Sequence, residues 1–228
     1  MSEKIIDKNL SRIIKIKMCT SDINDIEDIE DICIQDINLM EKKLNIDLTE
    51  IAKLKNLKSV SLKFFEITDE VVQAINQVQY LETIEFSMCI FKNKEVLNKN
   101  IKSVIIVNCQ DFKIDMLNAN TILEELQLVH SGIVDMVDIS NFKNLKYLKI
   151  AHCSATSVPS ITKLEYLERL YLNHIEIPYD IDISKMSNLK FMSLSGSNVP
   201  NKEMYVKNLY DQNKEIIIEF EENDKPIE

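Results

Sequence analysis

The sequence holds only two glycines, Gly132 and Gly196, in 228 residues. Phosphate-cradling loops of the G-x-x-x-x-G-K and G-x-G-x-x-G kinds need closely spaced glycines, so neither loop can be built. The H-E-x-x-H and G-x-S-x-G patterns of metalloproteases and serine hydrolases are also missing. No two cysteines have the C-x-x-C spacing that a structural zinc site would need. We therefore predict a protein that is not an enzyme and that carries no cofactor.

Long apolar segments are absent as well. No apolar run approaches the roughly 18 residues of a membrane-spanning helix. The first residues, Met-Ser-Glu-Lys-Ile-Ile-Asp-Lys, lack the apolar stretch of a secretory signal. The five cysteines, an odd number, fit a reducing compartment better than a disulfide framework. We expect a cytoplasmic protein.

Positive charge is the scarcer sign, with 27 Lys and Arg against 37 Asp and Glu, a formal net charge of -10. Proteins that bind nucleic acid draw much of their affinity from Lys and Arg that neutralise phosphates. Anionic membrane surfaces attract basic segments for the same electrostatic reason. We expect neither nucleic acid nor a membrane as a partner. The hydrophobic content of 45% is enough for a continuous core.

What the chain does contain is one repeated pattern. We number each copy so that L-x-x-L-x-L-x-x-(Asn/Cys) fills positions one to nine, and most copies follow one another after 22 residues. Two degenerate copies near Ser11 and Ile29 precede the clear ones, and a partial strand over residues 215–220 closes the series. The clear copies begin at Leu57, Leu81, Ile101, Leu123, Leu145, Leu167 and Leu189.

Each copy predicts a strand followed by a return segment. Apolar positions four and six alternate with polar neighbours, as in a half-buried strand, so about ten parallel strands are expected. In the copy from Leu145, an apolar residue at every third position favours 3₁₀ turns or short helical pieces on the convex side. Longer copies have room for helices over residues 69–78 and 40–54, the first with Asp69 at the positive end of the helix dipole.

These copies resemble the leucine-rich-repeat superfamily, most closely its 22-residue class, as in phosphatase-regulator and internalin-type repeats. The resemblance covers roughly residues 11–220 and implies a curved α/β solenoid with a parallel inner sheet, which binds proteins on its concave face. We expect one domain over residues 1–228. Its predicted parts are degenerate cap repeats 1–56, regular repeats 57–212, and a capping strand with an acidic tail over 213–228.

Four of the five cysteines fall on position nine, which points inward in this class of repeat. We expect them to be buried, reduced thiols that behave as small hydrophobic side chains. His152 precedes one of them, Cys153, but a thiol-protease pair is not expected, because neighbouring residues of an extended segment point to opposite sides. The four are Cys19, Cys89, Cys109 and Cys153.

All the histidines of the chain, His130, His152 and His174, fill position eight of successive copies, 22 residues apart. They are expected to line up as exposed rungs. Three interpretations stay open: surface or contact residues, a metal site to which Glu176 adds a carboxylate, and a pH-sensitive patch of imidazoles that repel one another when charged.

Positions three, five and seven should face solvent and form the binding surface, including the small side chains Ser103, Ala151 and Ser193. Aromatic residues and Arg beside an apolar strip are typical of interface hot spots. We therefore predict a non-enzymatic protein-protein interaction module for a protein or peptide, with a metal-binding or pH-sensing histidine ladder as the alternative. Basic groups in an acidic chain favour an acidic or neutral partner surface. The predicted contact residues are Tyr147, Lys149, Arg169, Tyr171, Phe191, Ile105, Val107 and Val129.

Overall fold

The structure is a computed structural model of the chain. The predicted repeat at residues 11–19, Cys19, most of the helix expected over 40–54 and the acidic end of the chain lie outside the residues that it describes. The described residues are 31–35, 48–54, 56–92, 94, 96–97, 100–117, 120–131, 133–134, 139–155, 159–177 and 181–220.

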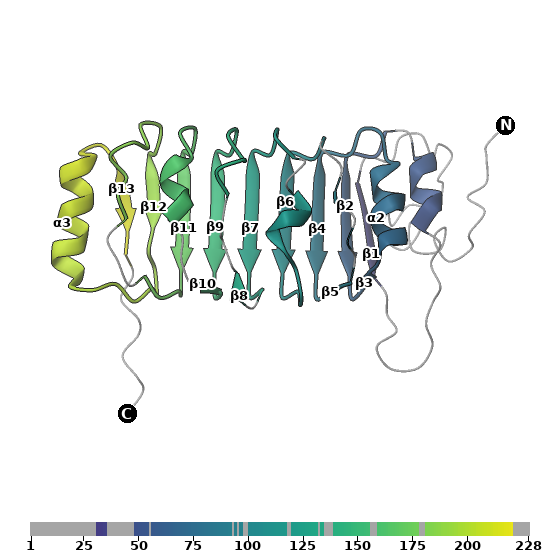
Figure 1. The fold of residues 1–228 in the computed structure, drawn as a ribbon, viewed down its shortest axis with the longest axis horizontal. Coiled ribbons are helices and arrows are strands. Elements are labelled where there is room, and N and C mark those ends of the chain that lie inside the picture. Colours follow the sequence, from purple (N-terminus) through teal and green to yellow (C-terminus); the bar gives the residue numbers. More distant parts are fainter. Residues whose placement is uncertain are drawn as a thin grey trace, which may run out of the picture. The chain divides into compact units, whose positions relative to one another are not determined.

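The chain divides into two compact units, Met1–Asn120 and Thr121–Glu228, and each contains strands that pair in parallel (Figure 1). The first unit has the strand order β1 (Asp31–Gln35), β2 (Ser59–Lys63), β4 (Thr83–Ser87), β6 (Ser103–Val107). The second has the order β7 (Glu125–Val129), β9 (Tyr147–Ala151), β11 (Arg169–Asn173), β12 (Phe191–Ser193), β13 (Ile217–Glu219).

Strands β2, β4, β6, β7, β9 and β11 span positions three to seven of their copies, as the pattern predicts. In the second unit the register aligns Leu126 with Leu148, and Leu148 with Leu170. All three side chains are fully buried, because successive residues of a strand point to opposite faces and this face forms the core. The leucine pattern therefore sets both the repeat length and the buried face.

The return segments carry short elements. Helix α2 begins at Asp69, as predicted, and packs against η2. The described part of the helix expected over 40–54 is 3₁₀ rather than α, since it consists of η2 alone. The 3₁₀ segment predicted after Leu145 is present as η4. These elements are η2 (Leu48–Lys53), β3 (Glu66–Ile67), α2 (Asp69–Asn76), β5 (Ile90–Phe91), η3 (Ile114–Leu117), β8 (Ile133–Val134), β10 (Ser154–Ala155) and η4 (Pro159–Lys163).

Helix α3 (Lys202–Gln212) was not predicted. It lies between β12 and β13 and buries Tyr205 and Leu209. Its carboxyl end is held by two hydrogen bonds: the Ile183 N–H donates to Oε1 of Gln212 (2.7 Å), and Nδ2 of Asn213 donates to the Leu189 carbonyl (3.0 Å). The chain then forms β13, which confirms the closing strand expected over residues 215–220.

The division into cap repeats, regular repeats and closing segment stays a prediction. In the part of the chain that the structure describes, no helix is long and apolar enough to cross a membrane.

Candidate interaction surface

The solvent-facing side of the sheet in Thr121–Glu228 carries a row of aromatic rings. Tyr147 lies on β9, Tyr171 on β11 and Phe191 on β12. The ring centroids of Tyr147 and Tyr171 are 5.1 Å apart, as are those of Tyr171 and Phe191, and the paired planes tilt by 33° and 39°. We call these three side chains the aromatic strip. Its members are half-buried, so part of each residue remains open to solvent.

The strand register explains this strip. Arg169 lies opposite Tyr147, and Tyr171 lies opposite Lys149. The four side chains form a checkerboard with the tyrosines on one diagonal and the cations on the other. Diagonal neighbours in a sheet are within reach of large side chains, so the rings of Tyr147 and Tyr171 can meet.

The phenol of Tyr147 stays protonated at neutral pH. Burial raises its pKa, and the neighbouring Tyr171 and Glu125 raise it further, while Arg169 lowers it. Tyr147 therefore contributes an uncharged ring and a hydroxyl group to the strip.

Lys149 and Arg169 differ from the lysines that immediately precede the strands of the same sheet. The charge of the side chain at position two alternates in sign from repeat to repeat, and each lysine there forms an ion pair with a glutamate. The four residues are Glu124, Lys146, Glu168 and Lys190. Nζ of Lys146 lies 2.8 Å from Glu124, and Nζ of Lys190 lies 3.2 Å from Glu168. No described carboxylate forms an ion pair with Lys149 or Arg169.

Small side chains depart from the predicted surface. Ala151 on β9 is only 3% exposed, and Ser193 on β12 is fully buried. In the other unit, Ser103 on β6 is buried as well. A small side chain beside larger neighbours on adjacent strands is covered by them, so a solvent-facing position does not make it a contact residue. The prediction that these three residues contribute to the surface is wrong.

The predicted apolar residues divide between the units. Val129 is half-buried at the end of β7, in the same unit as the aromatic strip. Ile105 and Val107 are half-buried on β6, in Met1–Asn120. Their contribution to one common surface with the strip stays a prediction.

Ile217 belongs to the surface and was missed. It pairs in register with Phe191, and its side chain is 64% exposed. The sequence has isoleucine at three consecutive positions here, so alternation does not show which one faces solvent. Ile216 is buried, and this places Ile217 on the opposite face.

The three histidines form a stack of imidazole rings at the carboxyl ends of the strands. The ring centroids of His130 and His152 are 4.2 Å apart, and those of His152 and His174 are 4.1 Å apart. The planes of these two pairs differ by 5° and 11°, so the rings lie face to face. All three side chains are exposed, which confirms the expected row of rungs.

The histidine backbone is left-handed rather than extended, with φ of 50° to 52°. Each histidine N–H still donates to the carbonyl of the following repeat, at 3.0 Å to Ala151 from His130 and to Asn173 from His152. The left-handed residue thus turns the chain without breaking the hydrogen-bond ladder. It exposes His152 and buries Cys153 as predicted, although the expected extended geometry is wrong.

Gly196 occupies position eight in the next copy, with φ of 70°. A Cβ atom built on it would lie 2.2 Å from Nδ1 of His174, closer than any real contact. The imidazole of His174 therefore packs directly on the glycine backbone, and glycine is required there for space as well as for conformation.

Comparison with solved structures identifies the fold. Internalin C2 from Listeria monocytogenes superimposes with a TM-score of 0.65 and 18% sequence identity over 94% of this chain and 93% of that one. An internalin F structure from the same species gives a TM-score of 0.59 and 18% identity over 78% of this chain, which spans about half (52%) of that one. No family model and no curated protein sequence matches the chain.

The chain has the leucine-rich-repeat fold. This confirms the predicted class, an α/β solenoid with an internalin-type arrangement of repeats.

Position nine of this leucine-rich-repeat chain faces inward. Cys89, Cys109 and Cys153 are at most 5% exposed. Sγ of Cys153 donates to the carbonyls of Ala151 (3.2 Å) and Leu128 (3.5 Å), so the thiol links neighbouring repeats. Burial raises the pKa of the Cys153 thiol, which disfavours the reactive thiolate. These three cysteines confirm the predicted buried thiols.

The stacked arrangement of the three imidazoles does not allow them to coordinate one metal ion together. A metal lies close to the ring plane of each imidazole that binds it, at about 2.0 to 2.1 Å from the nitrogen. Parallel planes that are 4.1 Å apart do not share such a point. Among the described residues, no group of three or more His, Cys, Asp or Glu is placed to hold a metal.

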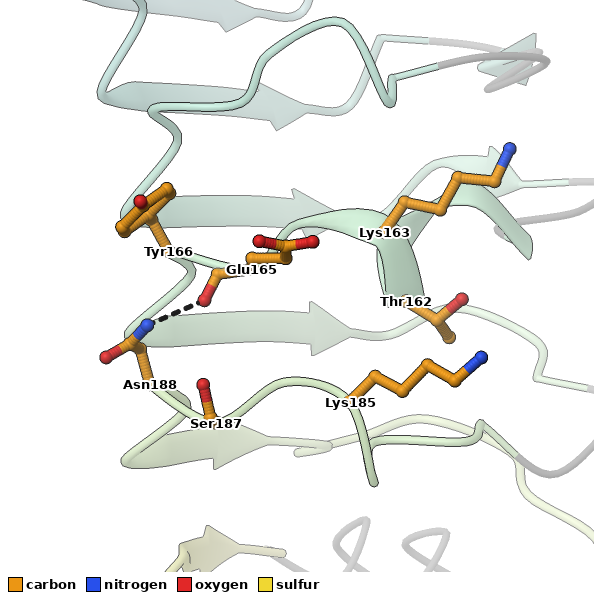
Figure 2. A pocket seen from close by; sticks show the side chains of 7 residues that line it. All are labelled: Thr162, Lys163, Glu165, Tyr166, Lys185, Ser187 and Asn188. Atoms are coloured by element: carbon orange, nitrogen blue, oxygen red, sulfur yellow. Dashed lines mark hydrogen bonds between the residues drawn. The ribbon is translucent and has the colours of Figure 1, made fainter.

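A shallow pocket of about 720 Å³ lies away from the aromatic strip, between η4 and the segment before β12 (Figure 2). Its two lysine amines lie at one end, and Tyr166 and Asn188 at the other. Nδ2 of Asn188 donates to the Glu165 carbonyl at 2.8 Å and closes that end. The lining combines hydroxyl groups with two lysine amines and one carboxylate. The lining residues are Thr162, Lys163, Glu165, Tyr166, Lys185, Ser187 and Asn188.

Proposed function

We propose that this chain is a non-enzymatic interaction module that binds a protein or peptide on the solvent-facing side of the sheet in Thr121–Glu228. The observation that carries the proposal is the continuous contact of Tyr147, Tyr171 and Phe191 across three strands. Tyrosine and arginine are enriched in interface hot spots, because they bury a large area and keep a polar group for the partner.

The neighbouring side chains support this surface. Arg169 lies between two members of the strip in the register, opposite Tyr147 on one side and Phe191 on the other. Ile217 extends the apolar row by one strand. Scattered surface aromatics are common and need no partner, but rings that touch one another across strands present one connected surface. The leucine-rich-repeat fold adds support by analogy only.

Site-specific photo-cross-linking tests the proposal. Benzoylphenylalanine is placed at Tyr171, on the strip, or at Tyr166, which is 56% exposed beside the pocket of Figure 2. Each variant is illuminated in a lysate of its source cell, and the products are identified by mass spectrometry. We expect a discrete cross-linked protein from position 171 and none from position 166.

A double variant, Arg169→Ala with Tyr171→Ala, should lose capture of that same protein and keep its fold, since Arg169 is exposed and Tyr171 half-buried. Cross-linking from position 166 alone would move the binding site to the pocket. Equal cross-linking from both positions would indicate nonspecific contact, and either result contradicts the proposal.

The imidazole stack supports a second candidate, a pH-sensing site, because three rings that lie this close repel one another when charged. The metal-binding alternative needs the rings to leave this stacked arrangement. Zinc titration by calorimetry tests the metal. Heat of zinc binding that disappears in His152→Ala would support a metal site, because that change removes the middle ring. The absence of heat at micromolar protein would contradict a metal site. We also propose a cytoplasmic location, which fractionation of the source cell tests.

A further inference from the structure

The charge pattern across the sheet face in Thr121–Glu228 indicates what kind of segment fits it. Lys149 on β9 and Arg169 on β11 form a central pair of cations. Glu125 lies on β7 and Glu219 on β13, so a carboxylate stands on each side of the pair. From β7 to β13 the face therefore runs negative, positive, positive, uncharged, negative, the uncharged strand being β12 with Phe191 and Ser193.

The central cations differ from the other charged groups of this face and its rim in their partners. Glu125 already accepts a hydrogen bond from Nε2 of Gln127 at 2.5 Å. Lys146 and Lys190, which precede β9 and β12, form ion pairs with glutamates. Lys149 and Arg169 have no ion pair with any carboxylate in the described part of this chain of net charge -10. Complementary charge across an interface favours the correct partner and suppresses wrong ones.

We propose that this face takes an extended acidic segment of a partner protein, which crosses the strands with its carboxylates over Lys149 and Arg169. The proposal rests on the proposed function and adds the partner's chemistry. Neutral or basic residues flank the carboxylates, because Glu125 and Glu219 repel further acids. Apolar side chains of the segment pack on Tyr171 and the other rings of the aromatic strip.

The strand spacing gives the length of the segment. From β7 to β13 there are four steps of about 4.8 Å, or about 19 Å in all. An extended chain rises about 3.3 Å per residue, so about six residues cover the face. The guanidinium of Arg169 can hold one carboxylate by two parallel hydrogen bonds, whereas Lys149 acts as a point charge.

Selection from a random peptide library displayed on phage tests the proposal with the full chain as target. The targets are the wild type, the charge reversal Lys149→Glu with Arg169→Glu, and Tyr171→Ala. A matched control, Lys163→Glu with Lys185→Glu, makes the same change of net charge at the pocket of Figure 2. Circular dichroism confirms that all four targets are folded.

The wild type and the control should enrich peptides with Asp or Glu at the centre, and the charge reversal should not. The best acidic peptide should bind the charge-reversed chain at least about tenfold more weakly, since like charges face each other there. Enriched peptides that need Tyr171 but show no excess of acidic residues would overturn this inference and leave the proposed function standing.

Other outcomes separate the two proposals differently. Peptides that bind Tyr171→Ala as well as they bind the wild type would overturn the proposed function itself. Acidic peptides that are lost only with Lys163→Glu and Lys185→Glu would place acid recognition at the pocket and overturn the inference. A library from which the wild type enriches nothing would contradict both.

Discussion

Replacing Gly196 with alanine tests whether the imidazole stack and the backbone turn beneath it depend on each other. The new Cβ would stand 2.2 Å from Nδ1 and 2.3 Å from Cε1 of His174. The imidazole has to leave its place, because the glycine backbone below it belongs to the hydrogen-bonded turn and cannot retreat. The residue at 196 must also keep φ near 70°, or the turn must change.

Two contributions determine the expected loss of stability. A residue with a Cβ in the left-handed region costs about 1 to 2 kcal/mol. Displacing the His174 ring removes its stacking on His152, and an aromatic pair contributes about 0.5 to 1.5 kcal/mol beyond the area it buries. We expect Gly196→Ala to lower the free energy of unfolding by roughly 1.5 to 3.5 kcal/mol, which combines these two effects.

A double-mutant cycle separates the two contributions. In a His174→Ala background the ring is gone, so Gly196→Ala should show the backbone cost alone, about 1 to 2 kcal/mol. Urea unfolding followed by circular dichroism gives the free energies of all four chains, and the coupling between the two sites should be about 0.5 to 1.5 kcal/mol. An equal cost of Gly196→Ala in both backgrounds, within about 0.3 kcal/mol, would refute the ring contact.

Three further predictions use the same unfolding assay or a chemical probe. Leu148→Ala should lower the free energy of unfolding by roughly 2 to 5 kcal/mol, because it opens a cavity in the core. Lys149→Ala, at the next position of the same strand, should change that free energy by less than about 0.5 kcal/mol. Equal losses from the two variants would mean that the strand register is wrong. Cys153 should resist iodoacetamide in the folded chain and react in urea, because burial raises its pKa; rapid labelling of the native chain, detected by mass spectrometry, would contradict this. Burial, and then the neighbouring imidazoles and Lys149, hold the pKa of His152 below its usual 6.5, so the folded chain binds this proton less readily than the unfolded chain does. Stability should therefore fall as the pH drops below 6.5, toward the folded-state pKa, and a pH dependence that is unchanged in His152→Ala would rule out this origin.

The repeated strands were predictable because one leucine pattern specifies both their spacing along the chain and the face that they bury. The L-x-x-L-x-L spacing gives the length of the repeat, and its alternation gives the buried face, so β2, β4, β6, β7, β9 and β11 match positions three to seven. The start of α2 was predictable from Asp69, a carboxylate at a helix amino terminus. For the aromatic strip, the same numbering gave the face and the rings but not their contacts, which depend on side-chain conformations across strands.

Helix α3 was missed because its apolar stripe is sparse. Only Tyr205 and Leu209 are buried among its eleven residues, and its other apolar side chains, such as Met204, are not part of the buried face. Two apolar residues four positions apart are too few for the repeating apolar face that identifies a helix in a sequence. The ends of this helix depend instead on contacts with distant residues, such as the hydrogen bond from Ile183 to Gln212.

The left-handed turn at position eight was also beyond the sequence. Histidine and asparagine tolerate positive φ, and glycine prefers it, but Phe64 and Met88 adopt it too, with φ of 64° and 54°. Their own chemistry does not favour this conformation. The ladder imposes it, because the Met88 N–H must donate to the Val107 carbonyl, at 2.8 Å, while the chain turns.

The alternating charges at position two bear on how such an array can change its length. Removing one repeat between Glu124 and Glu168 would put these two carboxylates side by side, without the Lys146 amine that now separates them. Removing two repeats would leave each remaining glutamate next to a lysine, as the pairs Lys146–Glu124 and Lys190–Glu168 are now. Each such ion pair contributes little stability by itself, yet all of them favour a glutamate next to a lysine in adjacent repeats. Lengthened or shortened versions of this protein should tolerate repeats added or lost in twos better than one at a time.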